Sequence, residues 1–142
     1  MMKRLRSQRG NALIETAITL PILLLVSVSI FEFGRAYQTW QVLTNASREG
    51  ARLAVIPGST DAQVRARVNQ YLSGGGLATV ADGNIALNRA VAFTPTSTGS
   101  QVQVNYPFQF MVLNPVIRLI ARSDNTGRGI YTMTASTLMR NE

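Results

Sequence analysis

The sequence of 142 residues contains no cysteine and no histidine. Without cysteine there is no disulfide framework, no thiolate nucleophile, no iron–sulfur cluster and no cysteine-type zinc site. Without histidine, the usual general base near neutral pH and the commonest metal ligand are both missing. With only 7 Asp and Glu residues, the sequence has few candidates for a catalytic carboxylate pair or for an oxygen-ligand site that binds a hard metal ion. We therefore expect a protein that is not an enzyme and has no cofactor or metal.

The remaining polar clusters do not change this expectation. Asp82-Gly83-Asn84 and Asp124-Asn125 contain residue types that bind metals, but ordinary turns use the same residues. Serine–lysine catalysis is excluded because the sole lysine, Lys3, lies at the N-terminus of the chain.

Basic residues outnumber acidic ones by 14 to 7, which gives a net charge of +7. Four of the basic residues, Lys3, Arg4, Arg6 and Arg9, lie in the first ten positions, and residues 11–142 carry only +3. The other arginines are dispersed and belong to no nucleic-acid-binding motif, so we interpret them as solvated surface residues. We expect no nucleic-acid partner.

An apolar segment of about the length of a bilayer core follows the basic leader. Residues 12–31 are uncharged apart from Glu15 and are rich in Leu, Ile and Val. Basic residues before a first apolar segment place that end in the cytoplasm, so everything downstream would lie across the membrane. The sequence therefore predicts a membrane-spanning helix with a cytoplasmic N-terminus.

The apolar segment continues, without a turn signal, into a stretch of helical periodicity that ends at Pro57-Gly58. We predict one helix over residues 12–56, bent at Pro21, whose first half is apolar all round and whose second half is amphipathic. Glu32 and Arg35 are expected on its solvated sides. Trp40 is predicted to be core, with ligand stacking as the alternative. It belongs to a small-to-apolar stripe formed by Phe33, Ala36, Tyr37, Trp40, Leu43, Ser47, Ala51 and Ala54.

A second helix is predicted after residue 60. Thr60 and Gln63 have capping-box spacing, and the run Gly74-Gly75-Gly76 is expected to end the helix in a flexible loop. The apolar residues of one face are Val64, Val68 and Leu72.

Further along the chain the hydrophobic period changes from 3.6 to 2, which is typical of strands. Strict alternation predicts a half-buried strand over residues 101–110, and Pro107 indicates an edge strand or a bulge. Similar patterns predict strands over residues 85–93 and 130–139, the second after a turn cluster at 123–129.

These elements predict an α+β protein. Its long N-terminal helix lies half in the membrane and packs its second half on the inner face of a small antiparallel sheet. Residues 113–120 are expected to form a short helical or irregular connection. We predict no internal repeat.

Gly10, Asn11 and Glu15 form a pattern of their own. A small residue closes the basic leader, and a carboxylate follows five positions later inside an apolar stretch. In one interpretation, Glu15 lies at the cytoplasmic headgroup level, where its charge costs little. In the other, cleavage after Gly10 creates an amine at Asn11 that neutralises a Glu15 buried against a neighbouring copy or a related subunit.

The sequence resembles the TadE-like proteins of tight-adherence (Flp, type IVc) pilus systems, and the Gly10–Glu15 spacing resembles a type IV prepilin processing signal. The alternating strand that ends in Tyr106-Pro107-Phe108 fits the same family. The residues that carry the resemblance are Arg9-Gly10, Glu15, Leu20-Pro21, Glu32-Phe33-Gly34-Arg35, Asn45-Ala46-Ser47-Arg48-Glu49-Gly50-Ala51-Arg52 and Thr134-Ala135-Ser136-Thr137-Leu138-Met139-Arg140.

The resemblance implies a pilin-like fold and a precursor cut after Gly10 by a prepilin peptidase. Residues 1–10 would be the cleaved leader, 11–33 the transmembrane half of the helix and 34–142 a periplasmic head. Major Flp pilins usually carry tyrosine after the glutamate and have almost no head, whereas this chain has Thr16 and a long C-terminal region. The resemblance therefore implies a minor pilin (pseudopilin), with an accessory role in assembly.

The implied location is the bacterial inner membrane, with possible entry into the extracellular pilus. The implied partners are the peptidase, the major pilin and other Tad/Flp subunits, including a TadF-like minor pilin. The alternative is an uncleaved, signal-anchored periplasmic or extracellular binding protein. A cleaved secretory signal peptide is disfavoured, because Ser27-Val28-Ser29 is a poor cleavage site and cutting there would split a continuous helix.

Overall fold

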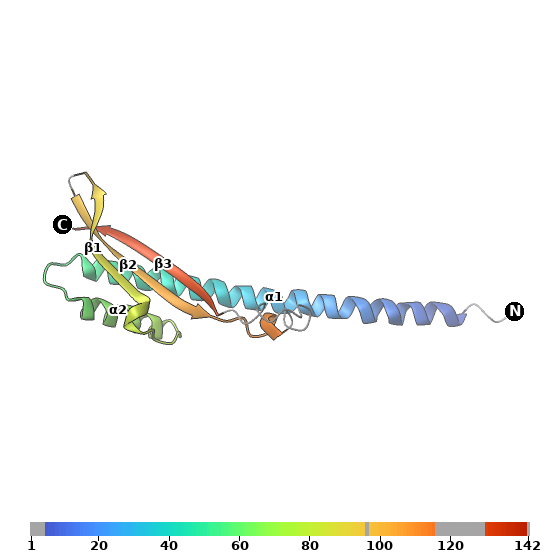
Figure 1. Cartoon of the computed structure of the whole chain (residues 1–142). Coiled ribbons are helices and arrows are strands. Elements are labelled where there is room, and N and C mark those ends of the chain that lie inside the picture. Colours follow the sequence, from blue (N-terminus) through green and yellow to red (C-terminus); the bar gives the residue numbers. More distant parts are fainter. Residues whose placement is uncertain (1–4, 96, 116–129, 142) are drawn as a thin grey trace. The chain divides into compact units, whose positions relative to one another are not determined.

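The computed structural model of the chain describes residues 5–95, 97–115 and 130–141, and it has the predicted α+β class (Figure 1). The chain divides into two compact units. The first, which we call the anchor unit, comprises residues 1–34 and 110–127, and the second, the head unit, comprises residues 35–109 and 128–142. The elements are the helices α1 (Leu5–Ala54) and α2 (Asp61–Gly74), the 3₁₀ turn η1 (Asp82–Asn84) and the strands β1 (Ile85–Thr94), β2 (Ser97–Phe108) and β3 (Tyr131–Arg140).

Helix α1 is continuous, as predicted, but it begins seven residues before the expected start at residue 12. Gly10 alone does not stop the helix, since one glycine costs only about 1 kcal/mol there. At its other end α1 stops at Ala54, because Pro57 disfavours helical backbone at the residue before it. Gly58 then turns the chain with a φ of +83°, in the left-handed region that favours glycine.

Helix α2 begins at the predicted capping box. The Thr60 hydroxyl accepts a hydrogen bond from the Gln63 N–H, and the Gln63 side chain accepts one from the Thr60 N–H. The glycine run ends this helix as predicted, but Gly75 has a tight packing role as well. A Cβ atom at Gly75 would lie 2.5 Å from Cγ1 of Val42 on α1. The close approach of the two helices therefore depends on glycine at this position.

The three strands form one antiparallel sheet in the order β1-β2-β3. All three predicted strands are present, with bounds shifted by at most four residues. The alternation in β2 is confirmed because Val102, Val104 and Phe108 are buried and the residues between them are not. The turn cluster at 123–129 and most of the predicted connection at 113–120 lie outside the described residues.

The prediction that Pro107 marks an edge strand is wrong for β2, which is the central strand. Strand β1 begins opposite Val104, so Pro107 lies beyond its pairing and is paired only with Thr132 of β3. Among the described strands, β2 has a neighbour on one side only at this position. The missing N–H of proline therefore leaves no ladder bond to β1 unmade.

The core of the head unit lies between the second half of α1, helix α2 and the inner face of the sheet. Small residues dominate the contribution of α1, which lets the helix approach closely. The fully buried core side chains are Leu43, Ala46, Ala51, Val64, Val68, Leu72, Val102 and Val104.

Trp40 is not core, contrary to the prediction, since 49% of it is exposed. Tyr37 and Phe33 of the same predicted stripe are also exposed, whereas Leu43 and the small residues after it are buried. The buried face in this part of α1 runs through Thr39, one position from Trp40. Thr39 tolerates burial because its hydroxyl donates to the Arg35 carbonyl at 3.0 Å.

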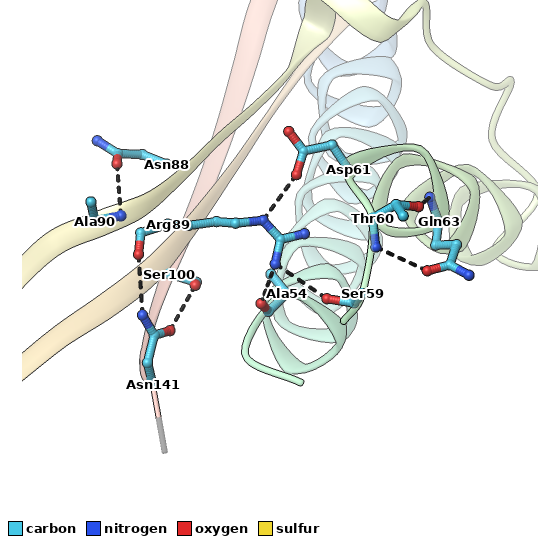
Figure 2. Close-up of polar contacts among 10 residues, drawn as sticks. All are labelled: Ala54, Ser59, Thr60, Asp61, Gln63, Asn88, Arg89, Ala90, Ser100 and Asn141. Atoms are coloured by element: carbon cyan, nitrogen blue, oxygen red, sulfur yellow. Dashed lines mark hydrogen bonds and ion pairs between the residues drawn. The ribbon is translucent and has the colours of Figure 1, made fainter. Parts of the chain in front are cut away.

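Arg89 of β1 connects the strand to the ends of both helices (Figure 2). Its Nη1 donates to the carbonyl oxygen of Ala54, the last residue of α1, at 2.7 Å, and its Nε donates to Asp61 Oδ1 at 2.9 Å. This places a cation at the C-terminus of α1, where the helix dipole favours it. Asn141 fixes the same corner, because its Nδ2 donates to the Arg89 carbonyl and its Oδ1 accepts from Ser100.

Candidate functional site

The first half of α1 exposes apolar side chains around its whole circumference. Within the described residues, α1 is the one helix long and apolar enough to cross a membrane, and none of its most apolar window is buried. Such a surface is stable in a bilayer and costly in water. The large exposed side chains are Leu13, Ile14, Ile18, Leu20, Ile22, Leu23, Leu24, Leu25, Val26, Ile30 and Phe31.

The hydroxyl groups in this half of α1 are bonded within the helix. Thr16 donates to the Ala12 carbonyl and Thr19 to the Glu15 carbonyl, both at 2.8 Å. Ser27 and Ser29 make the same contact with the carbonyls four residues before them, at 2.8 and 2.7 Å. Side chains satisfied in this way place no unpaired hydroxyl donor in lipid. The polar residues of the segment are therefore compatible with a membrane anchor.

The three residues of the expected processing site lie near one another on α1. Gly10, Asn11 and Glu15 are all exposed, and no atom of the described part of the chain lies within 4 Å of a Cβ atom placed on Gly10. Asn11 and Glu15 are four residues apart, so their side chains share one face of the helix, one turn from each other. The Glu15 carboxylate has no hydrogen bond to any described residue. The carboxylate can therefore form an ion pair with a positive charge from outside the described residues.

Glu32 has a role that the sequence did not reveal. It was expected on a solvated side of the helix, but only 5% of it is exposed. Its Oε1 accepts hydrogen bonds from the N–H groups of Met111 and Val112, both at 2.9 Å. Next to it, the rings of Phe33 and Phe110 meet edge to face, 6.0 Å apart. The last turn of the predicted span is thus tied to the segment after β2.

Arg35, three residues later, makes the corresponding contacts within the head unit. Its Nη2 donates to the Gln109 carbonyl, and its guanidinium carbon lies 4.8 Å from the centre of the Phe108 ring. This distance is that of a cation–π contact. Arg35 therefore holds the end of β2, and Glu32 holds the segment just after it.

Small residues near the end of α1 hold the helix close to the rest of the head. A Cβ atom at Gly50 would lie 2.6 Å from Val68 Cγ2 and 3.2 Å from Val102 Cγ1. Ser47 is fully buried, and its hydroxyl is 2.8 Å from that of Thr137 on β3. Neither contact could be inferred from one sequence, since both partners lie far along the chain.

The head unit also has an open groove between α1 and α2. Tyr37 and Tyr71 lie on its two sides, with Arg67 at one side, and the groove has a volume of about 740 Å³. Trp40 is not among the groove-lining residues, although its ring is 6.2 Å from that of Tyr37. The alternative ligand-stacking role of Trp40 therefore has no support from this groove.

The comparison with protein families gives the deciding observation. Residues 10–52 match the family described as TadE-like protein. This segment of the chain is similar to the TadE-like proteins. No curated protein and no solved structure matches the chain.

The match confirms the resemblance inferred from the sequence over residues 10–52. It includes Gly10 and Glu15, the apolar half of α1, and the residues that hold the head together, up to Arg52. The positions that the structure explains within it are Glu32 and Arg35, which hold residues 108–112, and Ser47 and Gly50, which pack on the head.

Proposed function

We propose that the protein is a membrane-anchored minor pilin (pseudopilin) of a tight-adherence pilus. One observation carries the proposal: α1 is a single helix whose first half is exposed and apolar, and whose second half forms the core of a folded head. A cleavable secretory peptide would have to be cut inside this helix. A pilin-type subunit keeps the helix intact and loses only the leader before it.

Processing after Gly10 fits the surroundings of this residue. Gly10 has open space around it and lies between the basic leader and the apolar half of α1. A prepilin peptidase at the cytoplasmic face would remove residues 1–10 and leave Asn11 as the new N-terminus. The head would then lie on the periplasmic side of the inner membrane, following the positive-inside rule.

Glu15 is the proposed assembly residue. A carboxylate inside the bilayer is costly unless it is paired, and the new amine of Asn11 supplies a positive charge. In a membrane that holds several pilus subunits, the amine of one subunit and Glu15 of another neutralise each other. The proposed partners are accordingly the major pilin, a TadF-like minor pilin and other Tad subunits, and the proposed role is structural, without catalysis.

A Gly10→Leu variant tests the processing step. We expect it to remain a full-length precursor when it is co-expressed with the cognate prepilin peptidase, whereas the wild-type chain is shortened. The products are compared by intact mass. The matched control is Gly34→Leu, since Gly34 also lies in α1 and has nothing within 4 Å of a Cβ position. This control should be cleaved like the wild type.

Two results would refute the proposal. If the wild-type chain stays uncut beside an active peptidase, the protein is better described as an uncleaved signal-anchored binding protein. If Gly10→Leu is cut at the wild-type site, the glycine is not part of the processing signal.

A further inference from the structure

The segment Phe110–Val112 presents apolar side chains to the surroundings in a part of the chain with no regular structure. Met111 is 70% exposed and Val112 is 44% exposed. Both residues belong to the same compact unit as the apolar half of α1. In water these exposures would be unfavourable, and next to a bilayer they are favourable.

The position of Val112 along α1 indicates how far this segment reaches. Val112 lines a hollow with Pro21, Leu24, Leu25 and Val28, all from the exposed apolar half of the helix. Leu24 and Leu25 precede Glu32 by seven or eight residues, which is about 10–12 Å along a helix. Val112 therefore lies beside the predicted span, on the membrane side of Glu32.

Irregular backbone at this depth requires partners for its polar groups. Each unpaired N–H in hydrocarbon costs several kcal/mol, so loops enter lipid only where these groups are satisfied by protein. The carboxylate of Glu32 supplies such a partner, since it accepts from the N–H groups of both Met111 and Val112 at 2.9 Å. Hydrogen bonds to a charged acceptor are the stronger kind. This accounts for a buried acid, Glu32, at the end of the apolar half of α1.

We propose that Phe110–Val112 is a second membrane contact, which inserts Met111 and Val112 into the outer leaflet boundary beside α1, and that Glu32 is its positioning residue. The partner is the lipid bilayer. The edge-to-face contact between the Phe33 and Phe110 rings holds the start of this segment against α1. The proposal rests on the membrane anchoring proposed above, and it adds that the membrane is met by two separate parts of the chain.

The absence of cysteine makes a direct test simple, since each introduced cysteine carries one label. Met111→Cys, Leu20→Cys and Ala86→Cys are labelled with an environment-sensitive fluorophore in the full-length protein. Each is reconstituted into vesicles of phosphatidylethanolamine and phosphatidylglycerol and exposed to a lipid-borne or an aqueous quencher. Leu20 is an exposed residue of the apolar half of α1, and Ala86 is an exposed residue of the head.

We expect the lipid-borne reagent to quench the fluorescence of the label on Met111→Cys, as it does on Leu20→Cys. The label on Ala86→Cys should be quenched by the aqueous reagent alone. Adding Glu32→Leu should shift Met111→Cys toward the Ala86→Cys pattern, because the loss of charge-assisted hydrogen bonds changes such an equilibrium by about tenfold or more. Glu32→Gln keeps a carbonyl oxygen in place and should retain most of the lipid quenching.

The outcomes separate the two proposals. If Leu20→Cys is quenched from the lipid and Met111→Cys only from water, the second contact is refuted while the anchor stands. If Met111→Cys is shielded from both quenchers, the segment is covered by protein and the lipid contact is refuted. If Leu20→Cys is not quenched from the lipid, the anchoring itself fails. Equal quenching of labelled Met111→Cys with and without Glu32→Leu would refute the role of Glu32.

Discussion

Gly50 lies where α1 closely approaches both α2 and β2. A methyl group there would come within 2.6 Å of a methyl group of Val68, a fully buried and conformationally stiff side chain. The helix, α2 and β2 would have to move apart to accept it. The block Arg48-Glu49-Gly50-Ala51-Arg52 that contributed to the family resemblance is therefore, in physical terms, a packing surface with charged residues at its edges.

We predict that Gly50→Ala destabilises the head. Overpacking costs about 1–3 kcal/mol, and the better helix propensity of alanine offsets about 0.5–1 kcal/mol of this. The measurement is thermal unfolding of the detergent-extracted full-length protein, followed by circular dichroism. Gly34→Ala in the same helix has open space around it and should unfold at the wild-type temperature or above. Equal unfolding temperatures for the two variants would contradict this packing account.

At the scale of elements, the two halves of α1 have different physical requirements. None of the most apolar window in the first half is buried, so this half needs an apolar environment, whereas the second half is covered by α2 and the sheet. Glu15 is the exception in the first half, because it is a charged residue in an otherwise uncharged, apolar segment. Its proposed partner therefore has to come from another subunit or from the new N-terminus.

Glu15→Gln tests this element without changing its shape. We expect the variant to be cleaved normally but to lose about tenfold or more of its co-isolation with the other pilus subunits, because pairing of a desolvated charge is lost. Co-isolation is measured from solubilised membranes by quantitative immunoblotting. Thr16→Val is the control, since the Thr16 hydroxyl is already bonded to Ala12. Unchanged co-isolation of Glu15→Gln would show that Glu15 makes no such pair.

The elements themselves could be predicted from the sequence because each has its own local signal. The capping box at Thr60, the alternation around Val102 and the turn at Pro57-Gly58 all act within a few residues. The prediction was wrong where a tertiary contact decided the outcome. Trp40 has the apolar character of a core residue, but the helix turns Thr39 inward instead, because the hydroxyl of Thr39 is satisfied by its own helix.

The role of Glu32 could not be predicted for a different reason. Its partners are backbone N–H groups of residues 79 and 80 positions away in the chain. Every residue except proline has a backbone N–H, so no particular residue type in the sequence identifies the partners of Glu32. The candidate processing residues were accessible to sequence reasoning because they depend on spacing from the leader, and their roles stay predictions.

For the molecule as a whole, the uneven charge distribution is the feature that processing would change most. The precursor carries +7, and a chain that begins at Asn11 would carry +3. Under the proposed function the basic leader orients the chain in the membrane, and the remaining charged residues are dispersed along the sequence. The proposed anchored helix, folded head and removable leader would together make a subunit that is inserted first and assembled afterwards.

The mature N-terminus is the measurement that tests this account most directly. The wild-type protein is extracted from membranes of cells with and without the cognate prepilin peptidase, and its N-terminus is determined by sequencing and intact mass. The account predicts a chain that begins at Asn11 when the peptidase is present and at the precursor N-terminus when it is absent. A chain that keeps its leader beside an active peptidase, or one that begins downstream of the apolar half of α1, would contradict it.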